Sequence, residues 1–417
     1  MTSINSLKEQ RKTQPALTKN MHNLMDKLRK IVRNPEVVNA YKQAICNVDD
    51  HVELSDKNPW KEQKIDFFVE YFHNWFTYLP RPNEGLGKII PFTYFYLNND
   101  KAYYFLNQFK SQPDSNTEPR TEIFNWIKAF VVERGIFMDS EESALYVDEW
   151  VDYLGDDIND FIIPDGGFKT FNQFFTRQLK PQSNSRPVCA PNDDSIVVAP
   201  ADSVINFIIS DLTLTQKLNV KSRQLNVTEL LNGSKFSPYF EGGTAVSCVL
   251  LPQNYHHYHA PVTGSIVEGV EIPGIYFGMT DGDTFLNDLN FGQGNAEFSL
   301  FEDFHRAYYI IKTEDYGHVG VVPVGLNTIS SINPTLVCNT MVRPGGKPVA
   351  VEKGQELGHF AYGGSLNILL FEANVLPALS VLMGNRIGTM NRKKIVTATH
   401  SAKEETDSKS PGPATPA

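Results

Sequence analysis

Histidines are concentrated in one short stretch of the chain. His256, His257 and His259 are three of the ten histidines, and they lie between Pro252 and Pro261. Imidazole is the side chain that titrates near neutral pH, so this stretch is a candidate for proton transfer. A metal site is the alternative, with His257 and His259 on one strand face. We predict no metal, because no carboxylate or cysteine lies nearby in the sequence to complete a ligand set.

A serine preceded by two glycines is the second candidate for chemistry. Gly363 and Gly364 come directly before Ser365, and residues 366–371 have the pattern of a buried strand. Glycine within a strand costs stability and usually marks a bulge or a close backbone approach. The Ser365 hydroxyl lies beside a carbonyl without side-chain bulk and could attack its own backbone. The alternative for this stretch alone is a glycine bulge capped by a serine.

A carboxylate could complete the set. Asp202 lies among small residues just before an apolar run, where a turn aspartate is the simpler interpretation. Asp202, a histidine of residues 256–259 and Ser365 together supply the orienting carboxylate, the base and the nucleophile of nucleophilic catalysis. A conventional serine hydrolase is less favoured, because residues 363–367 lack the second glycine of G-x-S-x-G.

Composition limits the class of protein. The 417 residues are 41% hydrophobic and 21% charged, which is typical of a globular chain. The net charge of −10 argues against nucleic-acid binding and against simple docking on anionic membranes. The first residues lack the apolar run of a secretory signal, and no stretch is apolar enough for a membrane span. Four cysteines without CxxC spacing predict reduced thiols in a cytoplasmic protein.

Hydrophobic spacing divides the chain into two domains with disordered tails, at residues 1–20 and 399–417. Residues 21–160 show helical spacing, and the aromatic stripe within residues 66–79 is predicted to be core rather than a ligand box. Residues 165–398 contain short β-type runs separated by turn signals, beginning with one at 195–198. We therefore predict an α+β fold, a helical N-terminal domain followed by a mainly β domain resembling a barrel or sandwich.

Six short motifs, taken in order, resemble the phosphatidylserine decarboxylase family of pyruvoyl enzymes. The resemblance covers about residues 165–375, and one such motif alone would be weak evidence. The matching segments are FNQFFTR at 171–177 with Arg186 and Pro187, APAD at 199–202, NYHHYHAP at 254–261, IPG at 272–274, VPVG at 322–325, and GQELGHF at 354–360 with Gly363, Gly364 and Ser365.

The resemblance implies that the protein makes its own cofactor. Ser365 would attack the carbonyl of Gly364, the chain would split between them, and Ser365 would become a pyruvoyl group. Residues 1–364 would form a large subunit and residues 365–417 a small one. The ketone would bind the substrate amine as a Schiff base. It would then accept the electrons that remain on the substrate when CO2 leaves. Asp202 and His259 match the family's carboxylate and its base for cleavage. His256 matches its proton donor to the carbanion, while His257 falls where relatives commonly carry arginine and has no assigned role.

One residue departs from the family pattern. Many members have a hydroxyl residue directly after the cleaved serine, whereas this chain has Leu366. Some short members also lack that hydroxyl, so cleavage remains the expectation. The alternative is a binding protein that keeps the fold and neither cleaves itself nor catalyses a reaction.

The family resemblance implies two alternative substrates. The helical first domain, Gly363–Ser365 and residues 273–277 resemble the soluble L-tryptophan decarboxylase branch, which favours a free L-amino acid, with an aromatic one as the candidate. In that case Tyr276 and Phe277 would line the substrate pocket. The alternative is phosphatidylserine, giving phosphatidylethanolamine. Family members are often dimers, so a homodimer is a further expectation by analogy.

Overall fold

A computed structural model of the chain describes residues 3–48, 58–82, 92, 94–96, 99–106, 118–214, 226–276, 304–326, 332–334, 345–362, 364–376, 379 and 383. Within these ranges the first part of the chain is helical. The α-helices are α1 (Ile4–Arg11), α2 (Lys19–Ile31), α3 (Pro35–Cys46), α4 (Ile65–Trp75), α6 (Glu118–Met138), α7 (Val147–Leu154), α8 (Phe171–Phe175) and α9 (Val227–Leu230), and the 3-10 helices are η1 (Asp100–Phe105), η3 (Glu141–Tyr146), η4 (Gly155–Asp160) and η5 (Ser237–Phe240).

Local sequence accounts for several helix ends. Asn34 caps α3 through its side chain, and Pro35 occupies the first helical position, where its missing N–H costs nothing. The expected disordered tail at residues 1–20 contains α1, which Ser3 caps and whose Leu7 is buried. Arg11 at its end forms an ion pair of 2.5 Å with Glu70 of α4. This anchoring by a distant helix cannot be read from a polar N-terminus.

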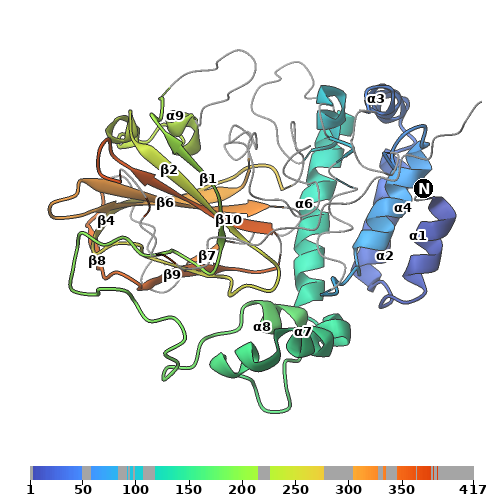
Figure 1. Cartoon of the computed structure of the whole chain (residues 1–417). Helices are drawn as coiled ribbons and strands as arrows, with labels where there is room; N and C mark the ends of the chain where they lie inside the picture. Colours follow the sequence, from blue (N-terminus) through green and yellow to red (C-terminus); the bar gives the residue numbers. More distant parts are fainter. Residues whose placement is uncertain are drawn as a thin grey trace, which may run out of the picture. The chain divides into compact units, whose positions relative to one another are not determined.

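An aromatic core holds the helices together. Figure 1 shows α2, α4 and α6 side by side. Phe72 of α4 meets Trp126 and Phe130 of α6 edge-on, each with ring centroids 4.9 Å apart. Edge-to-face pairs of this kind add to the stabilisation from burial alone. The prediction that the aromatic stripe of residues 66–79 is core is therefore confirmed.

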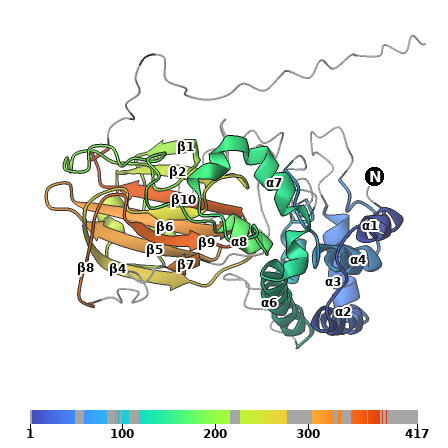
Figure 2. The ribbon, with the colours of Figure 1, turned by 90° about the horizontal axis from the view of Figure 1, so that it is seen from below.

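The second half of the described chain is built from antiparallel strands. One sheet has seven strands in the order β1-β2-β10-β6-β5-β4-β8, and a smaller sheet has the order β3-β9-β7 (Figures 1 and 2). The α+β prediction is confirmed. Among the described strands, the large sheet is open at β1 and β8 and does not close into a barrel. The strands are β1 (Val204–Ser210), β2 (Thr244–Leu250), β3 (His257–His259), β4 (Gly264–Ile272), β5 (Arg306–Lys312), β6 (His318–Leu326), β7 (Ile332–Pro334), β8 (Val349–Val351), β9 (Glu356–Phe360) and β10 (Gly364–Phe371).

The predicted strand at residues 195–198 is wrong. This segment is irregular, and the reason lies far along the chain. The buried ammonium group of Lys353 donates hydrogen bonds to the carbonyl oxygens of Ala190, Asp193 and Ile196, at 2.8, 2.6 and 3.0 Å. Three carbonyls spaced three residues apart can converge on one donor only if the backbone turns. Residues 195–198 therefore form a loop instead of a β-strand.

Strand β10 lies between two hydrophobic clusters. Leu366, Ile368 and Leu370 belong to the cluster shared with the helices. Leu369 and Phe371 belong to the cluster shared with Tyr258 of β3 and Leu357 of β9. Successive side chains of a strand point to opposite faces, so a strand buried on both sides is continuously apolar. By the same alternation, Ser365 lies on the face toward the three-stranded sheet.

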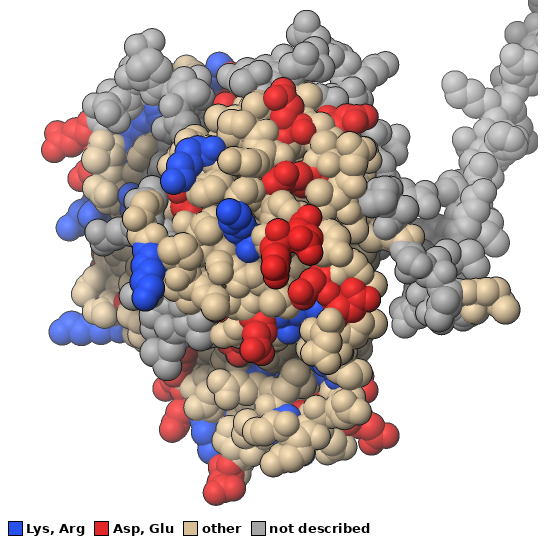
Figure 3. All heavy atoms as spheres, turned by 90° about the vertical axis from the view of Figure 1, so that its left-hand side faces the viewer, with Lys and Arg blue, Asp and Glu red and all other residues tan. Residues whose placement is uncertain are grey.

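The surface carries both signs of charge. Figure 3 shows a face on which acidic side chains gather beside fewer basic ones, in keeping with the net charge of −10. None of the described helices combines the length and the apolar character required to cross a bilayer.

Arg134 closes the C-terminal end of α4. Its fully buried guanidinium donates to the carbonyl oxygens of Trp75, Phe76 and Tyr78 at 2.8, 3.0 and 2.7 Å. The last carbonyls of a helix have no partner within the helix. Arg134 thus satisfies groups that would otherwise be buried without a donor.

Arg134→Met should lower the free energy of unfolding by about 3 kcal/mol or more, because it leaves several buried carbonyls unpartnered. Urea unfolding with an unchanged m-value measures this loss. Arg29→Met is the matched control. Arg29 pairs with Asp26 on the surface at 2.9 Å, so its loss should cost less than about 0.5 kcal/mol. Equal losses in the two variants would contradict this account of Arg134.

Candidate active site

Ser365 lies near the start of β10, an interior strand of the large sheet. It is the second residue of β10 and is paired with Leu250 of β2 and Gly325 of β6. Only 1% of the residue is exposed. Strands on both sides therefore fix its backbone, and its hydroxyl sits away from bulk water. Gly363, the first of the two glycines, lies outside the described residues.

His256 is the residue that meets this hydroxyl. Its Nδ1 lies 3.0 Å from Ser365 Oγ, and its Nε2 lies 3.1 Å from the carbonyl oxygen of Leu251. A carbonyl can only accept, so Nε2 carries the proton of the neutral ring. Nδ1 then presents a lone pair, and the Ser365 hydroxyl donates to it. The pair is arranged for proton transfer from serine to histidine.

Burial keeps the His256 ring neutral. Removal from water, with a smaller contribution from Arg177, lowers the pKa of His256 to about 3. The ring also stacks on Phe175 of α8, with centroids 3.7 Å apart. Its protonation state, its tautomer and its orientation are thus set by different neighbours.

Arg177 supports the turn before His256. Its guanidinium donates to the carbonyl oxygens of Gln253 and Asn254 at 2.7 and 3.2 Å. Burial lowers the pKa of Arg177 to about 10, which leaves it charged at neutral pH. This arginine of the FFTR motif thus acts on the backbone that leads into the histidine segment.

Asp202 has a different partner. Its carboxylate accepts from Arg186 Nε at 2.9 Å and from Nη2 at 2.7 Å. The backbone N–H of nearby His259 donates to the carbonyl of Pro200 at 2.7 Å. Burial lowers the pKa of His259, while Glu356 and Asp202 act in the opposite direction. Asp202 therefore acts on His259 through its charge, and the residue in contact with Ser365 is His256.

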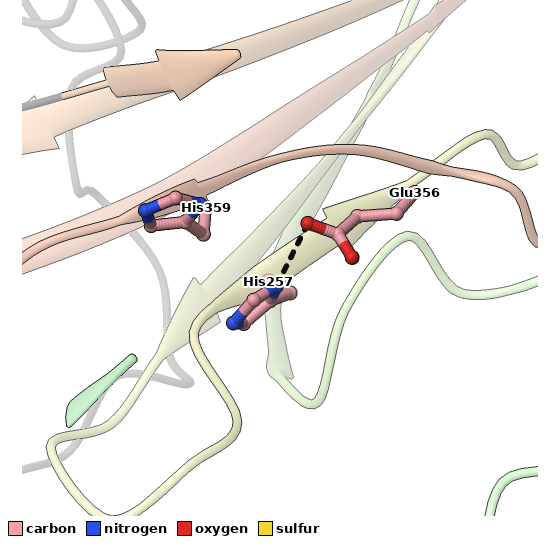
Figure 4. A group of neighbouring side chains, drawn as sticks. All are labelled: His257, Glu356 and His359. Carbon is pink, nitrogen blue, oxygen red and sulfur yellow. Dashed lines mark hydrogen bonds and ion pairs between the residues drawn. The ribbon is translucent and has the colours of Figure 1, made fainter. Parts of the chain in front are cut away.

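His257 belongs to a second group of side chains. Figure 4 shows the Glu356 carboxylate reaching over His257, with His359 on the neighbouring strand. His257 Nδ1 lies 2.9 Å from Glu356 Oε1. Burial raises the pKa of Glu356, but the hydrogen bond from His257 and the nearby His257, His259 and His359 outweigh it and lower that pKa. Residues 354–360 form one of the six family motifs, but the sequence alone does not single out Glu356 or His359 as a site residue.

The predicted pocket residues are only partly placed. Tyr276 lies edge-on to His305, with ring centroids 6.1 Å apart, and burial raises the pKa of its phenol. Phe277 lies outside the described residues. The pocket assignment remains a prediction.

Sequence comparison identifies the family. The sequence profile described as phosphatidylserine decarboxylase matches residues 171–389, just over half of the chain. The chain belongs to the phosphatidylserine decarboxylase family. The match begins at α8, which supplies Phe175, and extends beyond β10, which supplies Ser365. The predicted family membership is confirmed.

Individual members of the phosphatidylserine decarboxylase family match to different extents. Phosphatidylserine decarboxylase proenzyme 2 of Oryza sativa subsp. japonica is 31% identical over 268 residues, which cover 64% of this chain and 39% of the rice protein. The phosphatidylserine decarboxylase proenzyme of Clostridium tetani is 29% identical over 262 residues, covering 63% and 80%. Decarboxylase iboD of Amanita muscaria is 28% identical over 341 residues, covering 74% and 90%.

The histidine in contact with Ser365 should not titrate near neutral pH. The imidazole NMR signal of His256, assigned with His256→Asn, should stay unchanged between pH 8 and 5. In urea the unfolded chain should take up the proton near pH 6.5. Because the folded pKa is the lower one, His256 favours the folded state above pH 6.5, and this contribution is lost as the pH falls toward about 3. A folded-state midpoint between pH 6 and 7 would show that the ring is not held neutral.

Proposed function

We propose that this chain is the precursor of a pyruvoyl-dependent decarboxylase and that it cleaves itself between Gly364 and Ser365. The observation that carries the proposal is the buried hydrogen bond of 3.0 Å between Ser365 Oγ and His256 Nδ1. A serine is a weak nucleophile unless a base removes its proton. Family membership then indicates which reaction the activated hydroxyl undergoes.

The first step uses the buried pair of Ser365 and His256. His256 takes the hydroxyl proton while Oγ bonds to the carbonyl carbon of Gly364. The bond from that carbon to the Ser365 nitrogen breaks, and the nitrogen receives the proton from His256. Leu251 fixes the tautomer, and Phe175 fixes the plane of the ring. Exclusion of water favours attack by Oγ over hydrolysis.

The second step splits the chain. Removal of the α-hydrogen of residue 365 breaks its Cβ–Oγ bond and frees Gly364 as a carboxyl terminus. Water then replaces the nitrogen, which leaves as ammonia, and a ketone remains. We assign the removal of the α-hydrogen to His259, which the resemblance to the family implies as the base for cleavage; burial lowers the pKa of His259, and Glu356 and Asp202 oppose that shift. Arg186 is the residue that orients Asp202.

The residues present fit a pyruvoyl group at position 365. The group supplies a ketone that accepts the electrons released when a substrate carboxylate leaves as CO2. His256 Nδ1 faces this position, and we assign to it the transfer of the proton that replaces CO2. This assignment keeps the proton-donor role predicted from the sequence.

The substrate is an α-amino carboxylate, for which two sources are candidates. Phosphatidylserine is favoured by the names of the rice and Clostridium relatives. The other candidate is a free L-amino acid of the tryptophan type, which the resemblance of residues 273–277 and Gly363–Ser365 to the L-tryptophan decarboxylase branch implies. The match to Decarboxylase iboD, whose name specifies no substrate, does not decide between the two candidates.

Self-cleavage is tested by changing the serine. Wild-type protein should run as two bands on a denaturing gel, and Ser365→Ala should run as one band with at least about 10³-fold less decarboxylation, because nucleophile and cofactor precursor are both lost. Ser247→Ala is the matched control. Ser247 is also a buried serine of the sheet, on β2 opposite Ile368, and its hydroxyl has no hydrogen-bond partner in the described structure. Two bands from Ser365→Ala would refute the mechanism. An intact but active wild-type chain would do the same, and an intact, inactive one would support the binding-protein alternative.

The substrate is tested by CO2 release. Purified, cleaved protein is offered phosphatidylserine in mixed micelles and, separately, a panel of L-amino acids that includes tryptophan and serine. We expect release from one class to exceed release from the other by at least about 100-fold, because the two substrates differ in everything beyond the shared α-amino carboxylate. Release from lipid alone removes the amino-acid candidate, and release from amino acids alone removes the lipid candidate.

A further inference from the structure

None of His257, Glu356 and His359 is assigned a step in the proposed reaction, although the charge of Glu356 acts on His259. His257 and His359 lie directly opposite each other on the paired strands β3 and β9. Glu356 is paired in register with His259, but an irregularity between Tyr258 and His259 brings its carboxylate to His257. Folding thus supplies the carboxylate that the sequence around the histidines lacks.

Both ring nitrogens of His257 face oxygen atoms that can accept hydrogen bonds. Its Nε2 lies 3.1 Å from the carbonyl oxygen of Thr176, and its Nδ1 lies 2.9 Å from Glu356 Oε1. Both oxygens are acceptors, whereas a neutral imidazole has one N–H to donate. When the carbonyl takes that N–H, an additional proton or a metal ion must lie between Nδ1 and the carboxylate.

Three features fit a metal ion at this position. His359 supplies a third ligand atom, and the three ligand atoms lie within 4.8 Å of one another. Most metal-binding histidines are oriented by a hydrogen bond from the ring nitrogen that does not bind the metal. The contact between His257 Nε2 and the carbonyl oxygen of Thr176 can serve as such a bond. Tetrahedral zinc holds nitrogen and oxygen ligands about 3.3 Å apart, so the ligand atoms need to approach by no more than about 1.5 Å.

Two other histidine–glutamate pairs lack the third ligand. His305 pairs with Glu271 at 2.7 Å and His318 pairs with Glu372 at 2.8 Å. Among the residues that the structure describes, only the group of His257 gathers three potential ligands. The difference separates a candidate metal site from an ordinary ion pair.

We propose that His257, Glu356 and His359 bind a divalent transition metal of the zinc class and thereby clamp β3 to β9. Two imidazoles and a carboxylate suit zinc better than calcium or magnesium, which prefer oxygen ligands alone. The ion would secure the strand that continues directly from His256. Its role is structural, and the proposal is independent of whether the chain cleaves itself.

Metal binding is measured on the untagged, full-length protein after treatment with EDTA. Titration with zinc should show one site of micromolar affinity or tighter. Cobalt should give the visible absorption of a four-coordinate ion. At zinc concentrations 100-fold above Kd, Tm should rise by about 3 °C. His359→Asn should weaken binding at least 100-fold and abolish the rise in Tm.

His305→Asn and His318→Asn are the matched controls, since each removes a histidine paired with a glutamate outside the three-stranded sheet. Both should bind zinc as the wild type does. Binding weaker than millimolar in the wild type would overturn the proposal and identify the contact as an imidazolium–carboxylate pair. Unchanged binding by His359→Asn would overturn it as well. Circular dichroism confirms that each variant is folded.

Discussion

The buried contact between Ser365 and His256 is the interaction on which the candidate site depends. Among the residues that the structure describes, His256 is the basic partner of the hydroxyl, and it has a single lone pair to offer, because the carbonyl of Leu251 takes the other nitrogen's proton. In water such a pair would exchange partners continually. Within the protein, desolvation holds the histidine neutral and makes the pairing selective.

The sheet gives this contact its rigidity. Strand β10 is paired along both edges, with β2 and β6, and is packed against hydrophobic clusters on both faces. A side chain on such a strand has little freedom to move. Leu366, the departure from the family pattern, fits this setting, since it is fully buried in the cluster shared with the helices. A hydroxyl at that position would lie in an apolar environment.

The three neighbouring histidines have separate environments. His256 is joined to the serine, His259 is influenced by Asp202 and Glu356, and His257 is joined to Glu356 and Thr176. The alternation of side chains along an extended chain turns neighbours in sequence toward different partners. One short segment can therefore serve more than one purpose. Arginines support it from outside: Arg177 holds the turn before His256, and Arg186 holds Asp202.

The sequence by itself determined the α+β fold, the strand after Ser365, the aromatic core and the family, because periodicity and short motifs are local properties. It also supplied the types of residue needed for the chemistry. Only the tertiary structure decided that His256 rather than His259 meets Ser365, and that Glu356 and His359 join His257. Those contacts depend on strand register and on a local irregularity in β3, where a shift of one residue exchanges the faces of the strand. The loop at 195–198 has the same kind of cause, since it is set by Lys353, more than 150 residues away.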